Sequence, residues 1–473
     1  MEGIKLLCVV LAAIGLGYYL GRGGDLAETQ PKRSALVHIQ GLAKAQMDFC
    51  GPPAAGVGAV SFEMVYGEEM RPWMEAASDV FLRRCPNIQV KARAVPDIEA
   101  ADAILAGRLK PTLWAPSDEL SLHYLAHGWK QRGGEPPFRG ETGTSLVESP
   151  LVLLIWQDRL RLLSALLRRE RSAEGQWFRF ACALIPRDPD MNGMPIEAMV
   201  PGTWLDWYAP FAARLAAAPQ PVGDEPLPPL EEVKSWGRVK IGHAKPTRDS
   251  AGAAALYLMA YDYVLPPAER QALEREETGG GSAAAATRAD RIVRRFEKAY
   301  AENRAKLGKW LRRCDAGLDA PPPTTAALTK ALFDVGPSLY DGVVTYEHLA
   351  LPLLARIDRA DAMRKLVILY PQPTLIARHP LVFFDARADQ EAAVRRWLDF
   401  LLSVEMQEKA VEAGFRPVNP AVTIRGHNVE KNRFLRLRRY GVLLQPQWTE
   451  APRPGGGQIR DLLNLWGEVT GRN

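Results

Sequence analysis

Apolar and polar positions follow two different rhythms along residues 59–156. Runs that are apolar at alternate or most positions predict strands, and stretches with apolar residues three or four apart predict helices. The predicted strands are Ala59–Gly67, residues 88–95, Thr112–Pro116 and Pro150–Trp156, and the predicted helices between them are Arg71–Arg84, Asp97–Ala106 and Ser117–Trp129. This order of strand and helix predicts a mainly parallel sheet with helices on its faces.

The middle of the chain holds an irregular segment and then a strand that leads into an apolar helix. Residues 157–236 predict helices without a clear rhythm and include a proline-rich stretch. Arg238–Gly242 predicts a strand, and Ser250 is a good N-cap for a following helix that has almost no polar face and should be buried. Later elements are an amphipathic helix around Ile292–Leu311, strands at Asp341–Glu347, Leu366–Gln372 and Pro380–Asp385, and a helix at Gln390–Ala413.

The first residues form an apolar segment, Ile4–Gly21, whose only charge is Lys5 near its start. A membrane-spanning helix needs about 17 residues at the lower limit, and a signal sequence also fits such a segment. No A-x-A cleavage site follows, which favours an uncleaved anchor, with cleavage as the alternative. We therefore expect a signal anchor or transmembrane helix over residues 1–21 and a linker over residues 22–56.

Composition narrows the classes of protein to consider. Hydrophobic residues make up 47% of the chain and charged residues 24%, as in globular proteins. The net charge of +5 is small for 473 residues, and the basic run Arg433–Arg439 alternates with apolar residues, which indicates a solvated face and no nucleic-acid partner. The cysteines show no C-x-x-C spacing. Isolated buried cysteines are the favoured interpretation, although Cys50 can pair with Cys85 if the body is exported.

The sequence lacks the motifs of common catalytic and nucleotide-binding sites. It holds no G-x-S-x-G, no G-x-x-x-x-G-K-[ST], and no G-x-G-x-x-G after a strand. Glu119, His123 and His127 lie four residues apart, so one helix face can carry all three, but a solvated helix face is the more ordinary interpretation of such spacing. We expect neither an enzyme nor a bound metal or other cofactor.

Hydroxyl, aromatic and small side chains gather where predicted strands give way to helices. In an open α/β sheet, ligands lie at the carboxyl ends of strands, and helix N-termini offer N–H groups and partial positive charge. No nucleophile and base stand together at these junctions, which indicates a site that holds a ligand without transforming it. The candidate ligand-binding residues are Tyr66, Gly67, Trp114, Ser117, Ser149, Thr247, Ser250, Gly252, Tyr346 and Glu347.

The same residues have ordinary structural interpretations as well. In those, Ser117 and Ser250 are plain N-caps, Trp114 is a core residue and Glu347 is a first-turn acid favoured by the helix dipole. In the functional interpretation, Thr247, Ser250 and the amides near Gly252 reach an oxygen-rich or anionic ligand, and the glycine lets that ligand approach the backbone closely.

Several stretches, taken in order, resemble the bacterial extracellular solute-binding proteins, the two-lobed superfamily of ABC-transporter type. They are AILAGRLKPTLWAPSD, ESPLVLLIW, VKIGHAKPTRDSAGAAALYLMAY, VVTYEHLAL, YPQPTLIARHPLVFF and AGFRPVNP, and the resemblance runs from Ala59 to Pro420. It implies an α/β, two-lobed, periplasmic-binding-protein-like fold of type 2, with residues 57–155 plus 375–473 as one lobe and 156–374 as the other. Pro150–Trp156 and Pro380–Asp385 are then the crossing strands that carry the hinge.

The resemblance also implies a function. We expect a membrane-tethered solute-binding protein, its body in the periplasm or outside the cell, that captures a small oxygen-rich or anionic ligand in the interlobe cleft by hinge closure. An ABC permease is one implied partner. Some relatives occur with von Willebrand factor A domain proteins, so the alternative is a non-transport scaffold of a membrane complex with the same fold.

Overall fold

The computed structural model divides the chain into two compact units, Met1–Met47 and Asp48–Asn473. It describes residues 50, 59–135, 138–162, 184–186, 199–201, 203–206, 208, 228–266, 269–270, 272–273, 282–315, 318, 320–360, 365–384, 388–426 and 430–472. Within these residues no helix combines the length and the apolar character needed to cross a membrane. The expected membrane helix at residues 1–21 and nearly all of the expected linker lie outside the described residues, so both stay predictions.

The first sheet of the second unit is built around parallel strands, as the alternation of strand and helix predicts. Its order is β2-β1-β3-β12-β4. The strands are β1 (Val60–Tyr66), β2 (Ile88–Ala94), β3 (Leu113–Ala115), β4 (Arg139–Ser145) and β12 (Pro380–Phe383). β1 pairs in parallel with β2 and β3, whereas β12 runs antiparallel to β3 and β4. Because β12 comes from far along the chain, the sheet is completed only after the chain returns from the second sheet.

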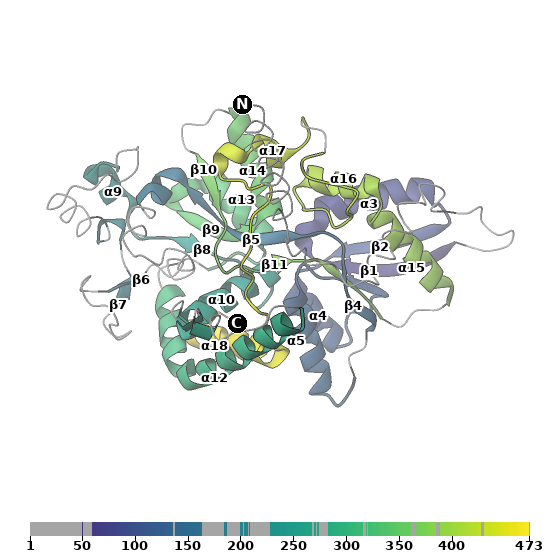
Figure 1. Ribbon diagram of the computed structural model, residues 1–473, viewed down its shortest axis with the longest axis horizontal. Helices are drawn as coiled ribbons and strands as arrows, with labels where there is room; N and C mark the ends of the chain where they lie inside the picture. The colour runs from purple at the N-terminus through teal and green to yellow at the C-terminus, as the bar shows by residue number, and fades with distance from the viewer. Residues whose placement is uncertain are drawn as a thin grey trace, which may run out of the picture. The chain divides into compact units, whose positions relative to one another are not determined.

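Aromatic side chains hold three helices against this sheet: α3 (Arg71–Arg84), α15 (Ala388–Leu401) and α16 (Val404–Ala413) (Figure 1). Phe81 on α3 meets Trp397 on α15 edge-on at 4.9 Å between ring centroids. The indole N–H of Trp73 donates to the carbonyl of Met406 at 3.0 Å. These side chains are fully buried, so the late helices α15 and α16 belong to the same core as α3.

The second sheet has the order β10-β5-β9-β8, with β11 also paired to β5. The strands are β5 (Ser149–Trp156), β8 (Ile241–Gly242), β9 (Gly342–Tyr346), β10 (Leu366–Leu369) and β11 (Ile376–Ala377). β5 is antiparallel to β9, β10 and β11. The expectation that Pro150–Trp156 lies in the first, parallel sheet is therefore wrong. No helix separates β4 from β5, so the chain has no crossover that could return it parallel to the same sheet.

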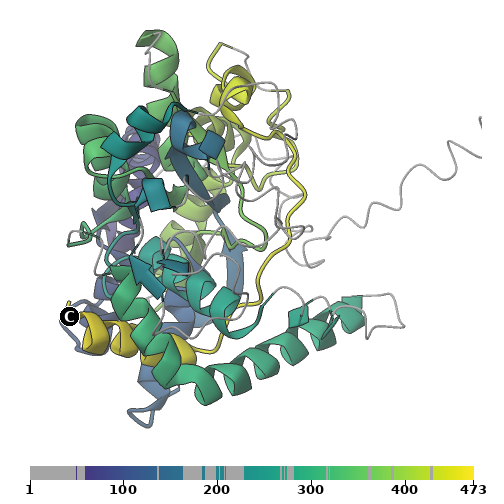
Figure 2. The ribbon, with the colours of Figure 1, turned by 90° about the vertical axis from the view of Figure 1, so that its left-hand side faces the viewer.

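Helices cover both faces of the second sheet. The longer ones are α10 (Ser250–Val264), α12 (Ser282–Asp315), α13 (Thr325–Val335), α14 (Glu347–Ala360) and α18 (Gly456–Thr470). α10 is buried almost all round, as its sequence predicts, and α12 and α18 pack on it. Figure 2 shows α18 beside the long helix α12. α18 also packs on α5 (Glu119–Lys130), which contacts α4 (Asp97–Leu105), so one apolar core runs across the helices of both lobes.

The remaining elements are short. They are η1 (Glu68–Met70), β6 (Leu184–Pro186), β7 (Met199–Pro201), α9 (Leu230–Trp236), η3 (Gly336–Ser338), α17 (Arg433–Arg436) and η4 (Arg438–Tyr440). β6 and β7 pair with each other in a separate two-stranded sheet.

The path of the chain defines two α/β lobes, one around each sheet. The chain leaves the first sheet between Ser145 and Ser149 and returns to it between Ala377 and Pro380. The predicted lobe boundaries as a whole stay a prediction, except that β5 belongs with the second sheet. The C-terminal part is likewise not confined to the first lobe, since α17 packs on α14 of the second.

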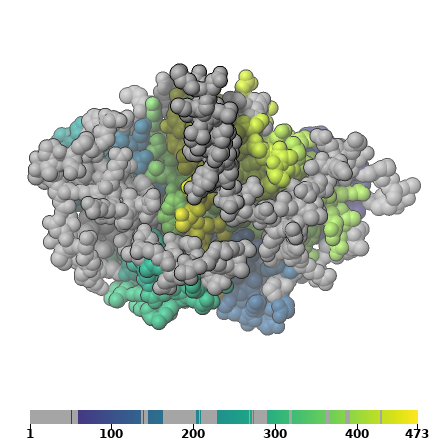
Figure 3. Space-filling model, in the orientation of Figure 1, coloured from purple at the N-terminus to yellow at the C-terminus, as the bar shows by residue number. Residues whose placement is uncertain are grey.

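An extended segment, residues 441–455, connects η4 to α18 and is called the strap here. Its Thr449 carbonyl accepts from the Thr374 amide at 2.9 Å, and the Ala451 amide donates to the Thr374 carbonyl at 2.8 Å. Figure 1 shows the strap crossing in front of β5, and its yellow atoms lie in the middle of the same face in Figure 3. The strap therefore lies over the region where the chain passes between the sheets.

Cys50 and Cys85 form a disulfide, and Cys314 is also disulfide-bonded. The favoured expectation of isolated cysteines is therefore wrong for these three. Disulfides persist in oxidising compartments, which agrees with a body outside the cytoplasm.

The Cys50–Cys85 disulfide should contribute measurably to stability. It closes a loop of 35 residues, and such a constraint on the unfolded chain stabilises a fold by about 3–4 kcal/mol. We expect the double variant Cys50→Ser/Cys85→Ser to lose about this amount in urea unfolding followed by circular dichroism. A loss below about 1 kcal/mol would show that the cross-link does not constrain the unfolded chain.

Candidate functional site

Polar side chains from both lobes meet where the strands of the two sheets end. They are Glu69, Asp97, Ser117, Asp249, Ser250 and Tyr346, called the junction cluster here, and all are 3% exposed or less. Glu69 follows β1, Asp97 begins α4 and Ser117 follows β3, and all three belong to the first lobe. The last three stand at the start of α10 and at the end of β9, in the second lobe. The carboxyl ends of strands thus form the site, as the fold class predicts.

Hydrogen bonds tie the junction cluster together. The Ser117 hydroxyl donates to Glu69 Oε2 at 3.0 Å, and the Ser117 amide donates to Asp97 Oδ2 at 3.2 Å. From the other lobe, the Ser250 hydroxyl donates to the same Asp97 oxygen at 2.5 Å and lies 3.2 Å from the Tyr346 hydroxyl. The bond between Ser250 and Asp97 joins the two lobes directly, so this structure represents a closed arrangement.

Two further contacts hold the lobes together beside the cluster. The Ile98 amide, in the first turn of α4, donates to the Arg248 carbonyl of the second lobe at 3.0 Å. The Arg248 guanidinium pairs with Glu99, with Nε 2.9 Å from Oε2. Since Arg248 and Glu99 are both more than 40% exposed, this pair contributes little energy, and the buried bonds of the cluster define the contact.

The helix starts that were expected to face a ligand are capped by the protein itself. Asp249, and not Ser250, is the N-cap of α10: its Oδ1 accepts from the Gly252 amide at 2.9 Å. Its Oδ2 accepts from the Thr325 amide at 2.9 Å, at the start of α13. The expectation that amides near Gly252 reach an anion is therefore wrong in this structure. Aspartate is as good an N-cap as serine, so the sequence Asp249-Ser250 did not decide between them.

Burial favours the protonated form of two carboxyl groups of the cluster, those of Glu69 and Asp97. Burial raises the pKa of Glu69 well above its usual range, and the neighbouring carboxyls of Asp249 and Asp97 raise it further. Burial also raises the pKa of Asp97 to about 7, although hydrogen bonds from Ser250 and Ser117 act against the shift.

The raised pKa of Asp97 makes stability depend on pH. Because the folded chain holds this proton up to about pH 7 and the unfolded chain releases it near pH 4, the stabilisation is full below pH 4 and is lost as the pH rises to 7. We expect the free energy of unfolding to fall over this range, with a slope against pH that corresponds to the release of about one proton on unfolding. Asp97→Asn should flatten that slope, whereas the exposed control Asp79→Asn should not. An unchanged slope in Asp97→Asn would contradict the shift.

Some polar atoms at the junction have no partner despite full burial. They are Glu69 Oε1, Asp97 Oδ1 and both ring nitrogens of His379. His379 lies between β11 and β12, where the chain returns to the first sheet, and has φ +43°. Its amide donates to the Ser117 carbonyl at 3.1 Å. Burial lowers the pKa of His379 to about 3, so its ring is neutral. Groups of this kind in a native fold call for a partner.

The structure brings four of the predicted residues together: Gly67, Ser117, Ser250 and Tyr346. A Cβ at position 67 would lie 2.2 Å from Ser117 Oγ and 2.7 Å from Asp97 Oδ1. The glycine is therefore needed for the close approach of the cluster, although not through its backbone conformation. Its φ of −60° and ψ of 137° suit any residue.

Other predicted residues have structural roles. Trp114 is fully buried in the apolar core. Ser149 Oγ accepts from the His348 amide at 3.2 Å and so caps the start of α14. Glu347 is fully buried and pairs with Arg416, with Nε 2.7 Å from Oε2. Trp114 and Glu347 thus match their ordinary interpretations as a core residue and a first-turn acid, and Ser149 serves as a cap.

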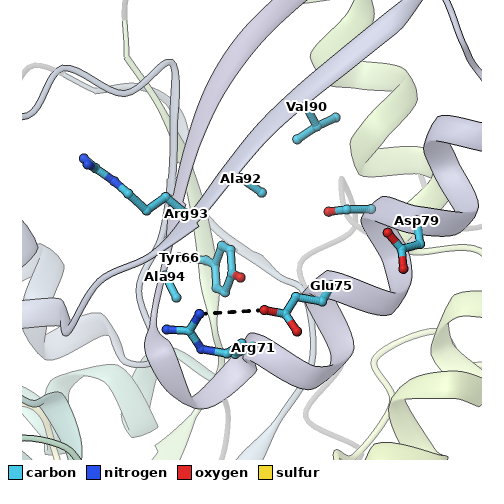
Figure 4. A pocket seen from close by; sticks show the side chains of 9 residues that line it. Tyr66, Arg71, Glu75, Asp79, Val90, Ala92, Arg93 and Ala94 are labelled. Atoms are coloured by element: carbon cyan, nitrogen blue, oxygen red, sulfur yellow. Dashed lines mark ion pairs between the residues drawn. The ribbon is translucent and has the colours of Figure 1, made fainter.

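Two predicted residues and the glycine of α10 lie outside the cluster. Tyr66 lines a separate cavity of about 310 Å³ between α3 and β2, beside the ion pair of Arg71 and Glu75 (Figure 4). Thr247 lies in the turn before α10 and is half-buried. A Cβ at Gly252 would lie 2.5 Å from the Ala244 carbonyl oxygen. That glycine therefore admits the chain's own backbone, and not a ligand.

The strap supplies contacts beside the site that sequence reasoning missed. Arg453 lies 3.4 Å from Asp118 Oδ2, 3.2 Å from Glu119 Oε2 and 2.6 Å from Glu450 Oε1. His123 Nδ1 lies 3.1 Å from the Pro454 carbonyl oxygen. The face spaced like a metal site is thus occupied by the strap, and no group of three His, Cys, Asp or Glu in the described ranges is placed to hold a metal ion.

Comparison with known families settles the class of this protein. The family described as bacterial extracellular solute-binding protein matches residues 62–416, which is most of the chain. The chain belongs to that family. It is thus an extracellular solute-binding protein, and the family is one of binding proteins and not of enzymes. The resemblance seen in the sequence is confirmed.

Solved structures of binding proteins are similar at low identity. The sulfate-binding protein SubI from Mycobacterium tuberculosis is 13% identical, with a TM-score of 0.41, over 88% of this chain and 99% of that one. The periplasmic binding protein AfuA from Actinobacillus pleuropneumoniae is 11% identical, with a TM-score of 0.45, over 88% and 100%. The ferric binding protein from Campylobacter jejuni is 11% identical, with a TM-score of 0.43, over 86% and 98%. No curated protein matches the chain.

Proposed function

We propose that this solute-binding protein captures a small ligand at the junction cluster and closes its two lobes over it. The binding residues are Gly67, Ser117, Ser250 and Tyr346 from the predicted set, joined by Glu69, Asp97 and His379. The order of the first sheet, with the returning strand β12 between β3 and β4, supports the type 2 form of the fold.

The observation that carries this proposal is the set of buried atoms without partners. Glu69 Oε1, Asp97 Oδ1 and the His379 nitrogens stand at the carboxyl ends of strands, beside the bond from Ser250 to Asp97 that joins the two lobes. A buried polar atom without a partner costs about 1–3 kcal/mol. A ligand that supplies those partners stabilises the closed form specifically.

Opening would break contacts across the lobes, among them those of the apolar core that the helices of both lobes share. The chain passes between the sheets at residues 146–148 and 378–379, which we propose as the hinge. Rotation there would separate Ser250 from Asp97 and the Ile98 amide from the Arg248 carbonyl. An N-terminal anchor would hold the protein at the membrane surface, where an ABC permease partner would receive the ligand.

Two measurements test binding at the cluster: the identity of small molecules that copurify with the protein, and the affinity that a cluster variant loses. The full chain is purified, denatured, and its released small molecules are identified by mass spectrometry, followed by calorimetry with each compound found. We expect the double variant Ser250→Ala/Tyr346→Phe to bind at least ten-fold more weakly, while the exposed control Ser235→Ala binds normally. Unchanged affinity in the double variant would show that the ligand binds elsewhere.

A second candidate function is a non-transport scaffold, for example with a von Willebrand factor A domain partner. It is favoured by the capping of α4, α10 and α13, whose first amides already pair with the protein itself. Affinity capture of the full chain separates the candidates. Recovery of a permease supports transport, and recovery of a von Willebrand factor A domain protein without any small molecule supports the scaffold.

A further inference from the structure

The C-terminal part of the chain, the strap and α18, contacts both lobes. It lies beyond the region that the solute-binding family matches, which ends at residue 416. α18 packs on α10 and α12 of the second lobe and on α5 of the first. An element that packs on both lobes resists their separation, because opening must detach it from one of them.

Polar and apolar contacts fix α18 to the second lobe. Asp461 on α18 accepts from the Tyr300 hydroxyl at 2.6 Å and from Arg304 Nε at 2.9 Å, both on α12. Gly308 on α12 allows close packing, since a Cβ there would lie 3.0 Å from the Leu465 side chain. Buried apolar side chains of α18 belong to the core that α10 and α12 also form. α18 is therefore anchored on the second lobe.

The first lobe meets this element on the face of α5 that carries Glu119, His123 and His127. Glu119 Oε2 lies 3.2 Å from Arg453 Nε, and His123 Nδ1 lies 3.1 Å from the Pro454 carbonyl oxygen. His127 packs against the glycines at the start of α18. The face that is spaced like a metal site is therefore a docking face for the strap and α18.

Two glycines at the start of α18 bring it closer to α5 than larger residues would allow. A Cβ at Gly456 would collide with the His123 carbonyl oxygen and would lie 2.6 Å from His127 Cβ. A Cβ at Gly457 would lie 3.0 Å from the His127 ring. Neither glycine has a positive φ, so close packing on α5, and not backbone conformation, is what requires them.

Arg453 joins the strap to both lobes at once. Its guanidinium lies 3.4 Å from Asp118 Oδ2 in the first lobe and donates to the Ile376 carbonyl of the second lobe at 2.6 Å. Glu450, which also pairs with Arg453, lies 2.7 Å from Arg378 at the proposed hinge. The Arg453 side chain is only 10% exposed, so solvent screens these contacts little. Movement of α5 relative to α10 would break them.

We propose that the strap and α18 form a clasp that holds the two lobes closed before any ligand binds. The inference rests on the proposed function, in which the junction cluster serves the closed form. A ligand then enters through transient opening, and the clasp sets how often opening occurs. Because the closed form is already populated, little of the ligand's binding energy is used to close the lobes.

Hydrogen exchange of the full chain, freed of copurified small molecules by dialysis, tests the clasp with Gly456→Ala. Alanine favours a helix more than glycine does, so a loss comes from the collision with α5. We expect peptides covering Asp97–Leu105 to exchange about ten-fold faster than in the unaltered chain, with β5 unchanged. The control Gly471→Ala strains the end of α18, where a Cβ meets nothing within 4 Å, and should leave exchange at Asp97–Leu105 unchanged.

Arg453→Met is an independent second variant, because it removes the link to Asp118 without adding an atom to the α5 contact. We expect the same acceleration, and this variant decides the result if Gly456→Ala fails to fold by circular dichroism. Unchanged exchange at Asp97–Leu105 in a folded variant would overturn the clasp. Equal acceleration of β5 would overturn it too, since that indicates a general loss of stability. The proposed function is judged separately, by the affinity lost in Ser250→Ala/Tyr346→Phe.

Discussion

Replacing Arg416 by methionine should destabilise the protein by about 3–5 kcal/mol, because a buried carboxylate would lose its only cation. Glu347 is 0% exposed, and its carboxylate accepts hydrogen bonds from Arg416 Nε at 2.7 Å and from Arg416 Nη2 at 2.8 Å. The same guanidinium donates to the carbonyls of Leu443 and Leu444 at 2.7 and 3.0 Å. The change therefore also frees the start of the strap. Chemical unfolding with urea measures the loss.

A double-mutant cycle separates the charge pair from the packing. Glu347→Gln alone leaves a buried arginine, and the combined variant Arg416→Met/Glu347→Gln leaves no buried charge. We expect the combined variant to be more stable than the sum of the single losses predicts, with a coupling of about 1–3 kcal/mol. If the stability losses of the two single variants are additive, or if the variants lose ligand affinity with unchanged stability, Glu347 would instead be assigned to the binding site.

Gly67→Ala should abolish tight closure although its backbone suits alanine. The added Cβ would lie 2.2 Å from Ser117 Oγ and 2.7 Å from Asp97 Oδ1, inside the junction cluster. Overpacking of this kind costs about 1–3 kcal/mol. Since the strain falls on the closed form, ligand affinity should drop by about 5- to 150-fold. Calorimetry with the identified ligand measures the drop.

Gly107 provides the opposite case. Its φ of +70° favours glycine, but a Cβ there would meet nothing within 4 Å. Gly107→Ala should cost about 1 kcal/mol of stability through backbone strain and leave affinity unchanged. If Gly107→Ala affected affinity as much as Gly67→Ala, the effect would be a general one on folding and not a collision in the cluster.

The sequence was sufficient for the general form of the site. Ser117 was found because it follows a predicted strand and Tyr346 because it lies at the end of one, and the carboxyl ends of strands form the binding edge in α/β sheets. Local pattern fixes where strands end, and the two lobes bring those ends together. Ser250 was found for a partly wrong reason, since it bonds across the lobes while Asp249 caps the helix.

The acidic character of the site could not be predicted in the same way. Glu69 and Asp97 stand near helix starts, where acids are common because the helix dipole favours them. Whether such a carboxylate is solvated or buried depends on how closely the other lobe approaches, which no local pattern records. The same limit applies to His379, because its burial comes from neighbours far away in sequence, among them Tyr346 and Phe415.

Strand pairing was the other limit. The apolar run Pro150–Trp156 was predicted as a buried strand, and the structure confirms it as Ser149–Trp156. Periodicity shows that both of its faces are covered, but not which strands pair with it or in which direction. Its antiparallel place in the second sheet, against β9 and β10, comes from the direct connection to β4.

Hydrogen exchange at the start of α4 tests the hinge closure most directly. The Ile98 amide donates across the lobes to the Arg248 carbonyl, whereas the amides of β5 lie inside one sheet. If the lobes open about the hinge, peptides covering Asp97–Leu105 should exchange much faster than those covering β5, and a bound ligand should slow them selectively. Equal protection of both segments, unchanged by ligand, would mean that the two lobes form one rigid body and would contradict capture by closure.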